Sequence, residues 1–309
     1  MPCPFGRSRP SNARIVPTVL RVWDTPRPMP EKTNALPTKF RSGTKPLFPH
    51  AAMLRPVPGR LSFDRVATIY DETRSLAPRA MARLLAVLVD ELHRKRVLEI
   101  GVGTGRYAVP LQKSGIRVVG VDISRPMVEF GLAKGLRDVV FAEGAHLPFA
   151  PRSFDVATTN HVLHLVANWR EVFAEIARVT RETYFTVIER SQRVDSIQRD
   201  YDDLLREAGY EYHHPGIHER DLPSLVKPDM VIPVGPFHET VPADTLLKEF
   251  AGRAYSSQWE VPEPIHREAI ARLRQQWGGK DYSRSYALEV TFWRIDRIPE
   301  LAKATVQRS

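Results

Sequence analysis

The sequence predicts an α/β protein with a mostly parallel sheet covered by helices on both faces. Short apolar, β-branched segments alternate with amphipathic helical segments through the middle of the chain, which is typical of parallel sheets. Three alternating glycines directly follow the first of these strands, at the sheet edge where such folds bind ligands. The 309 residues are 42% hydrophobic, so the chain can bury a globular core.

Residue periodicity places the elements in order. Before the glycines we expect helices over 63–70 and 77–92 and a strand over 96–100. After them we expect helices over 106–113, 126–134, 169–179 and 195–208, and strands over 116–121, 139–142, 154–159 and 183–188. Ser124 is the expected N-cap of the second of these helices. The last hundred or so residues are less regular, and in them we expect helices over 243–251 and 264–277 and a strand over 286–295.

The first 60 residues differ in composition from the rest. They hold 12 of the 26 prolines, which disfavour helix and sheet, so we expect a disordered, basic, proline-rich tail. Three explanations compete: a transit peptide, a nucleic-acid tether, or a non-native leader before a true start at Met53. We favour the leader, because the patterned sequence begins just after it.

The net charge of +9 is confined to that tail. Residues 1–60 carry 11 Lys/Arg and 2 Asp/Glu, so residues 61–309 carry 45 − 11 = 34 basic and 36 − 2 = 34 acidic side chains. This balance argues against nucleic-acid binding by residues 61–309. We expect no membrane span, because no apolar run approaches about 20 residues. The single cysteine, Cys3, excludes an internal disulfide and fits a cytoplasmic location.

The spacing of the glycines selects among ligands. The segment reads Glu99-x-Gly101-x-Gly103-x-Gly105. The dinucleotide pattern G-x-G-x-x-G fails in both registers, and no Gly-Lys-Ser/Thr follows to make a P-loop. The segment resembles the first motif of class I S-adenosylmethionine-dependent methyltransferases, of the UbiE or methyltransferase type 11 branch.

Further motifs extend the resemblance from about Phe63 to Arg190. Gly120-Val-Asp122-Ile-Ser124 ends the second strand, Ala142-Glu-Gly-Ala-His-Leu-Pro-Phe149 follows the third, and Asn160-His-Val-Leu-His-Leu165 follows the fourth. The resemblance implies a Rossmann-like, doubly wound, seven-stranded sheet that binds S-adenosylmethionine and releases S-adenosylhomocysteine. It implies a cofactor-binding core over 61–190, with residues 191–309 forming a substrate-side lid and the last strands of the same domain.

The resemblance also implies the cofactor contacts. Asp122 would hold the ribose hydroxyls, and Glu143 would face the adenine amine in place of the family's Asp. Tyr70 and Arg74 belong to a segment that packs over the cofactor. Alternatives are a helix cap for Asp122, a loop-orienting role for Glu99 and a solvated loop acid for Glu143. The expected cofactor-binding residues are Tyr70, Arg74, Glu99, Gly101, Gly103, Gly105, Asp122, Ile123, Glu143, Gly144, Ala145 and Asn160.

Two histidines lie where an acceptor could meet the methyl group. His161 or His164 could act as a general base, or His164 could pack as a structural residue. His213, His214 and His218 suggest a metal, but Pro215 and Gly216 break any helix between them. We expect a polar loop there and no metal.

The expected reaction is methyl transfer to a small molecule by in-line displacement. The chain lacks the Asn-Pro-Pro-Tyr motif found in amino-methylating enzymes of nucleic acids, and its cysteine is far from the site. RNA or protein acceptors, a non-catalytic S-adenosylmethionine-binding subunit and a nicotinamide oxidoreductase are the alternatives. The sequence leaves the oligomeric state open.

Overall fold

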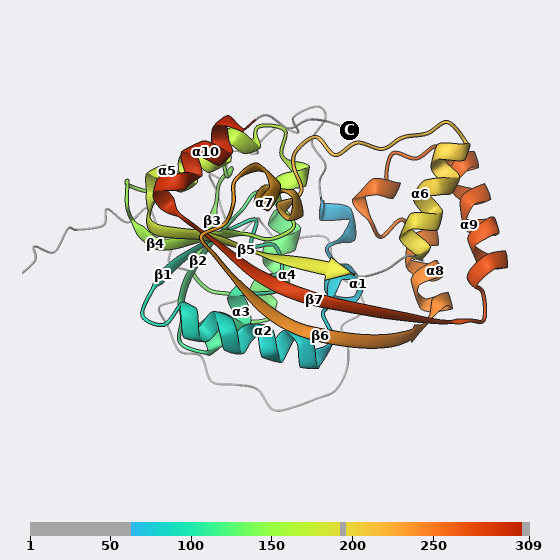
Figure 1. Ribbon diagram of the computed structural model, residues 1–309, viewed down its shortest axis with the longest axis horizontal. Coiled ribbons are helices and arrows are strands. Elements are labelled where there is room, and N and C mark those ends of the chain that lie inside the picture. The colour runs from blue at the N-terminus through green and yellow to red at the C-terminus, as the bar shows by residue number, and fades with distance from the viewer. Residues whose placement is uncertain (1–62, 192–195, 305–309) are drawn as a thin grey trace, which may run out of the picture. The chain divides into compact units, whose positions relative to one another are not determined.

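The centre of the molecule is a seven-stranded sheet with spatial order β3-β2-β1-β4-β5-β7-β6 (Figure 1). The computed structural model describes residues 63–191 and 196–304. The first five strands pair in parallel, and β7 is antiparallel to both of its neighbours. The strands are β1 (Arg96–Ile100), β2 (Arg117–Asp122), β3 (Val139–Phe141), β4 (Phe154–Thr159), β5 (Thr180–Ser191), β6 (Met230–Pro242) and β7 (Asp281–Arg294). This sheet confirms the predicted Rossmann-like fold.

Helices cover both faces of the sheet (Figure 1). On one face α2 and α3 share a core with β6 and β7, and on the other α5 and α10 pack in a second core. In α2, Ala80, Leu84 and Leu88 recur every four residues and are buried. The described α-helices are α1 (Tyr70–Arg74), α2 (Pro78–Glu91), α3 (Ala108–Lys113), α4 (Arg125–Ala133), α5 (Trp169–Val179), α6 (Ile197–Glu207), α7 (Leu222–Leu225), α8 (Ala243–Ala251), α9 (Glu263–Trp277) and α10 (Ile298–Lys303).

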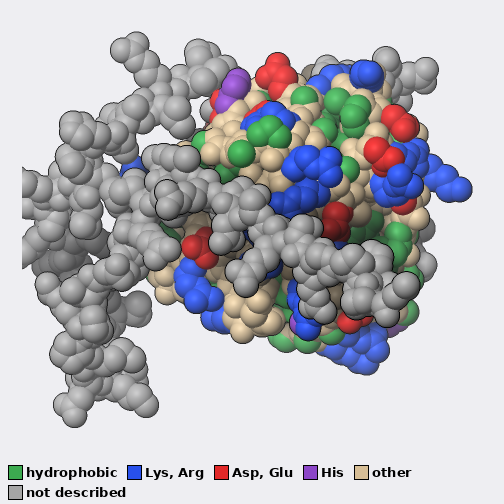
Figure 2. Space-filling view, turned by 90° about the vertical axis from the view of Figure 1, so that its left-hand side faces the viewer, with side chains coloured by type: hydrophobic (Ala, Val, Ile, Leu, Met, Phe, Trp, Pro, Cys, Tyr) green, Lys and Arg blue, Asp and Glu red, His purple; other side chains and the backbone are tan. Residues whose placement is uncertain are grey.

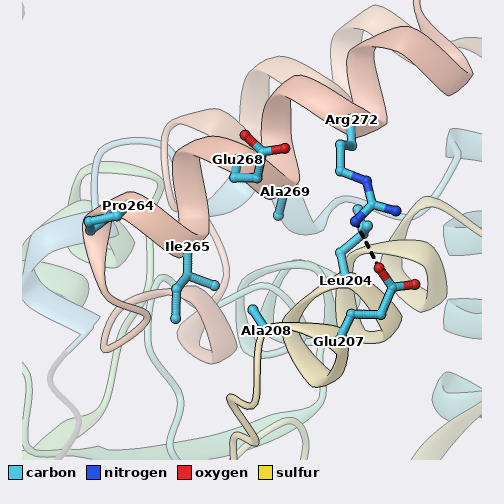
Figure 3. Close-up of a pocket in the computed structure, with 8 residues that line it drawn as sticks. All are labelled: Leu204, Glu207, Ala208, Pro264, Ile265, Glu268, Ala269 and Arg272. Atoms are coloured by element: carbon cyan, nitrogen blue, oxygen red, sulfur yellow. Dashed lines mark hydrogen bonds and ion pairs between the residues drawn. The ribbon is translucent and has the colours of Figure 1, made fainter.

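A third core joins α6, α8 and α9, at the end of the long β6–β7 pair (Figure 1). Tyr201, Phe250 and Leu273 are buried in it. We call these three helices the cap. A pocket of about 410 Å³ lies between α6 and α9, where Arg272 pairs with Glu207 at 2.7 Å (Figure 3). Every residue that lines this pocket comes from the two helices or from the positions just beside them.

The structure corrects several sequence-based boundaries. Strand β6 was not predicted from the sequence, and it contains Pro233, Pro236 and Pro242, which disfavour a strand. These prolines are tolerated because β6 lies at the sheet edge, where a missing N–H costs least. Strand β7 begins five residues before the predicted position, where it pairs with β6. Within the first expected helix, over 63–70, only a 3-10 turn (Phe63–Val66) forms, and α1 begins at its last residue, Tyr70.

Two other expectations concern the N-terminal tail and the absence of a membrane span. The predicted tail over 1–60 lies outside the described residues. No described helix combines the length and the apolar character that crossing a membrane requires.

Candidate functional site

The glycine loop follows β1 and has no side chain at every second residue. Gly101, Gly103 and Gly105 have φ of 73°, 51° and 72°, in the left-handed region that favours glycine. A Cβ on Gly101 would lie 2.1 Å from Val162 Cγ2, and one on Gly105 would lie 2.7 Å from Val109 Cγ2. The loop is tied to β2, since the Gly101 amide donates to the Val121 carbonyl at 2.7 Å. Conformation and packing therefore both require glycine here.

Asp122 ends β2 and faces this loop. Its Oδ2 accepts a hydrogen bond from the Gly103 amide at 2.7 Å, and its Oδ1 accepts one from the Ser124 amide at 2.8 Å. Ser124 itself caps α4 by accepting from the Met127 amide at 3.3 Å, as predicted. Burial raises the pKa of Asp122, although backbone hydrogen bonds oppose the increase. Asp122 thus joins the glycine loop to the residue that caps α4, and a carboxylate has about four lone-pair sites, so it can accept from a further donor.

Glu99 lies beneath the loop and is only 3% exposed. Burial, reinforced by the charge of Asp122, raises its pKa to about 8, while a hydrogen bond from the Ala108 backbone opposes this. Its Oε2 is buried without a hydrogen-bond partner. Buried polar atoms are rarely left unpaired in folded proteins. The bare turn, Asp122 and this orphaned oxygen together fit an amino-acid nucleoside with a donor group.

The segment around α1 packs against the glycine loop. Asp71 Oδ1 accepts a hydrogen bond from Thr104 Oγ1 at 2.6 Å, which brings Tyr70 and Arg74 to the loop. Burial raises the pKa of Tyr70, and the charges of Arg106 and Arg74 oppose this. Arg106 was not predicted from the sequence, yet it directly follows the glycines and its Nε is buried without a partner. Its position directly after the glycine motif could have marked Arg106 as a candidate site residue.

Four more of the expected cofactor-binding residues follow β2 and β3. The Ala142 amide donates to the Asp122 carbonyl at 3.2 Å, which brings residues 142–145 beside the end of β2. Ile123 is 37% exposed although it is hydrophobic, Glu143 is half-buried and Ala145 is buried. A Cβ on Gly144 would lie 2.9 Å from Ile100 Cγ2, so this position is closely packed.

The remaining candidate residues, Asn160, His161 and His164, lie in the loop after β4, where each has different surroundings. Asn160 is buried and ties β4 to β5, since its Oδ1 accepts from the Val187 amide at 3.0 Å and its Nδ2 donates to Thr158. His161 has φ of 59° and an exposed side chain. Desolvation by surrounding protein, together with the charge of Arg106, lowers its pKa to about 4.

His164 belongs to a different cluster. Its ring stacks on His218 at a centroid distance of 5.1 Å and meets His214 edge-on at 4.7 Å. Its Nδ1 lies 3.8 Å from Glu219 Oε2. His214 and His218 lie in a loop, as expected, but their rings are half-buried rather than fully exposed. In the described part of the chain, no group of three or more His, Cys, Asp or Glu side chains is placed to hold a metal ion.

This histidine cluster predicts acid sensitivity. Burial lowers the pKa of His214 to about 3 and that of His218 to about 4, and the charges of His164 and Arg220 add to this while Glu219 opposes it. Unfolded histidines take up protons below a pH of about 6.5, but these two in the folded state do not until about pH 4. Stability is therefore full above pH 6.5 and falls as the pH drops. Each ring contributes at most about 1.4 kcal/mol per pH unit, less where solvent screens it.

Urea unfolding at pH 7.5, 6 and 5 measures this loss. The substitution His214→Asn should flatten the decline, and His213→Asn, which changes an exposed neighbour, should leave it as steep as in the parent protein. Equal slopes in all three proteins would contradict the assignment.

Comparison with known proteins agrees with this geometry. A family model described as a methyltransferase domain matches residues 98–186, which include the glycine loop, Asp122 and the β4 loop. The chain contains a methyltransferase domain. The glycine motif and Asp122, on which the resemblance to class I S-adenosylmethionine-dependent methyltransferases rests, both lie within the matched segment.

Curated relatives share the domain but not the whole chain. A demethylmenaquinone methyltransferase from Renibacterium salmoninarum is 33% identical over 124 residues, which are 38% of this chain and 52% of the relative. The biotin biosynthesis bifunctional protein BioHC of Cellvibrio japonicus is 33% identical over 122 residues, which are 39% of this chain and 24% of the relative.

A third relative is the uncharacterized methyltransferase YcgJ of Bacillus subtilis, 30% identical over 126 residues, with 39% and 50% covered. The solved structure of YcgJ matches 68% of this chain and 97% of its own, at 19% identity and a TM-score of 0.44. The chain thus spans about half the length, or less, of the curated relatives that share its methyltransferase domain.

Proposed function

We propose that this chain is an S-adenosylmethionine-dependent methyltransferase with a small-molecule acceptor. The observation that carries the proposal is the bare three-glycine turn beside Asp122, above the unpartnered Oε2 of Glu99. When bound, S-adenosylmethionine supplies an already activated methyl group. The chain therefore needs chiefly to orient an acceptor in line with that group, and such positioning contributes up to about 7–11 kcal/mol.

Individual residues take distinct roles in this proposal. Asp122 accepts hydrogen bonds from the ribose hydroxyls, and Glu143 accepts one from the adenine amine. The exposed Ile123 contacts the adenine ring. Glu99 accepts from the amino group at the amino-acid end, while Tyr70 and Arg74 cover the cofactor. Gly144, Ala145 and Asn160 shape the walls. His161 faces the acceptor, whereas His164 is engaged in the histidine cluster.

A small acceptor is supported by charge and by the cap. Acidic side chains are interspersed among the basic ones on the face in Figure 2, unlike the continuous basic surface that nucleic acid favours. Arg74 Nη2 donates to the Ala254 carbonyl at 3.1 Å, and its guanidinium lies 4.0 Å from the Tyr255 ring centroid. Residues after α8 thus contact α1, which supports the proposal that residues 191–309 form a lid over a core at 61–190. One similar protein is named as acting on demethylmenaquinone, itself a small molecule.

Titration calorimetry tests the cofactor. We expect S-adenosylhomocysteine to bind with a dissociation constant in the micromolar range, and NAD and NADP to give no heat. Nicotinamide binding without S-adenosylhomocysteine binding would favour an oxidoreductase. A second assay would follow transfer of tritium from methyl-labelled S-adenosylmethionine to reduced demethylmenaquinone and to tRNA. Tight binding without transfer to any acceptor would favour a non-catalytic subunit, and transfer to tRNA would overturn the small-molecule acceptor.

A further inference from the structure

The loop after β4 is held by a segment that lies far along the chain. The Ile217 amide donates to the Leu163 carbonyl at 3.2 Å, and the Gly216 amide donates to the His164 carbonyl at 3.0 Å. A Cβ on Gly216 would lie 1.9 Å from the Leu163 carbonyl oxygen, so only glycine permits this approach. Residues 216–219 therefore dock on the backbone that follows His161.

Glu219 makes the strongest of these contacts. It is 7% exposed, and its Oε1 accepts hydrogen bonds from the Val162 amide at 2.7 Å and the Leu163 amide at 3.0 Å. Burial alone would raise the pKa of Glu219, but His164 and the Leu163 amide outweigh it and lower the pKa to about 2. An ionised carboxylate thus binds two consecutive amides, and such charge-assisted bonds are about twice as strong as neutral ones.

These two amides come directly after a strained residue. His161 has φ of 59°, and the left-handed region is unfavourable for a residue other than glycine. Such a conformation persists where the surrounding structure fixes it. Glu219 is the buried group that fixes the next two residues, and its charge and that of Arg106 both act on the His161 ring.

We propose that Glu219 is a positioning residue that holds His161 toward the methyl acceptor. The proposal rests on the proposed function only for what His161 faces, since the contacts of Glu219 are independent of any cofactor. Without the carboxylate, Val162 and Leu163 lose their shared acceptor, His161 relaxes to an ordinary backbone conformation, and its ring leaves its desolvated position.

The test compares Glu219→Ala with Glu219→Gln. In Glu219→Ala we expect the Val162 and Leu163 amides to exchange with deuterium at least 100-fold faster. The His161 ring, assigned in NMR spectra by comparison with His161→Asn, should titrate near the ordinary histidine pKa of about 6.5 instead of about 4. Glu219→Gln retains one acceptor oxygen, so exchange should stay within about tenfold and the His161 pKa should stay low.

Asp155→Ala is the matched control. Asp155 also accepts a backbone hydrogen bond from another segment, the Arg96 amide at 2.8 Å, but at the opposite end of β4. Its loss should lower stability and leave the His161 titration unchanged. A His161 pKa that stays low in Glu219→Ala, or one that rises equally in Asp155→Ala, would overturn the proposal. Calorimetry with S-adenosylhomocysteine on the parent protein reports on the proposed function separately.

Discussion

Replacing Asp122 with alanine should weaken S-adenosylhomocysteine binding by about 100-fold. The carboxylate lies at the end of β2, and its oxygens, with about four lone-pair sites, already accept from the Gly103 and Ser124 amides. Two hydrogen bonds from a ribose diol to a charged acceptor contribute about 1.5 kcal/mol each, so their loss totals about 3 kcal/mol. Titration calorimetry measures the change directly.

The substitution also releases the Gly103 amide, so loop disruption has to be separated from ribose binding. An analogue of S-adenosylhomocysteine without the 2′-hydroxyl makes the separation. The parent protein should bind the analogue about tenfold more weakly than S-adenosylhomocysteine, and the Asp122→Ala protein should bind both equally. If Asp122→Ala still discriminates between them tenfold, the ribose is held elsewhere.

Local sequence was sufficient for the elements that build the cofactor side. The sequence patterns there are short: strands of five or six mostly apolar residues, a serine before a helix with proline in its first turn, and three alternating glycines. Each of these patterns can therefore be recognised from a few neighbouring residues alone. The structure brings Asp122 to Gly103 because β1 and β2 are adjacent parallel strands, which the alternation of strand and helix predicts.

The parts that sequence did not predict depend on distant contacts. Glu219 is 57 residues from Val162, and nothing in the local pattern of a helix-breaking, histidine-rich segment indicates which loop it meets. Strand β6 carries prolines that contradict strand propensity, and only its place at the sheet edge makes it acceptable. In both cases contacts between segments distant in the sequence determine the structure, and the local sequence does not reveal those contacts.

Substituting alanine for Gly101 should destabilise the fold by about 3 kcal/mol. Two costs add: about 1 kcal/mol for a side chain at φ of 73°, and about 2 kcal/mol for forcing a methyl group into Val162. The new Cβ would lie 2.1 Å from Val162 Cγ2, far inside contact distance, so β1 and the β4 loop must separate. Urea unfolding measures the loss, and S-adenosylhomocysteine binding should fall with it because the same turn belongs to the proposed cofactor site.

The substitution Gly115→Ala separates the conformational cost from the cost of the collision with Val162. Its φ is 86°, but nothing lies within 4 Å of a Cβ added there, so Gly115→Ala should lose only the conformational part, about 1 kcal/mol. Adding Val162→Ala to Gly101→Ala removes the nearest colliding atom, so the double variant should be more stable than Gly101→Ala alone. If the second substitution is merely additive, the collision is not the cause and the loop tolerates a side chain. Rescue would show that the glycine is required by contact with the β4 loop, which couples the cofactor turn to the segment carrying His161.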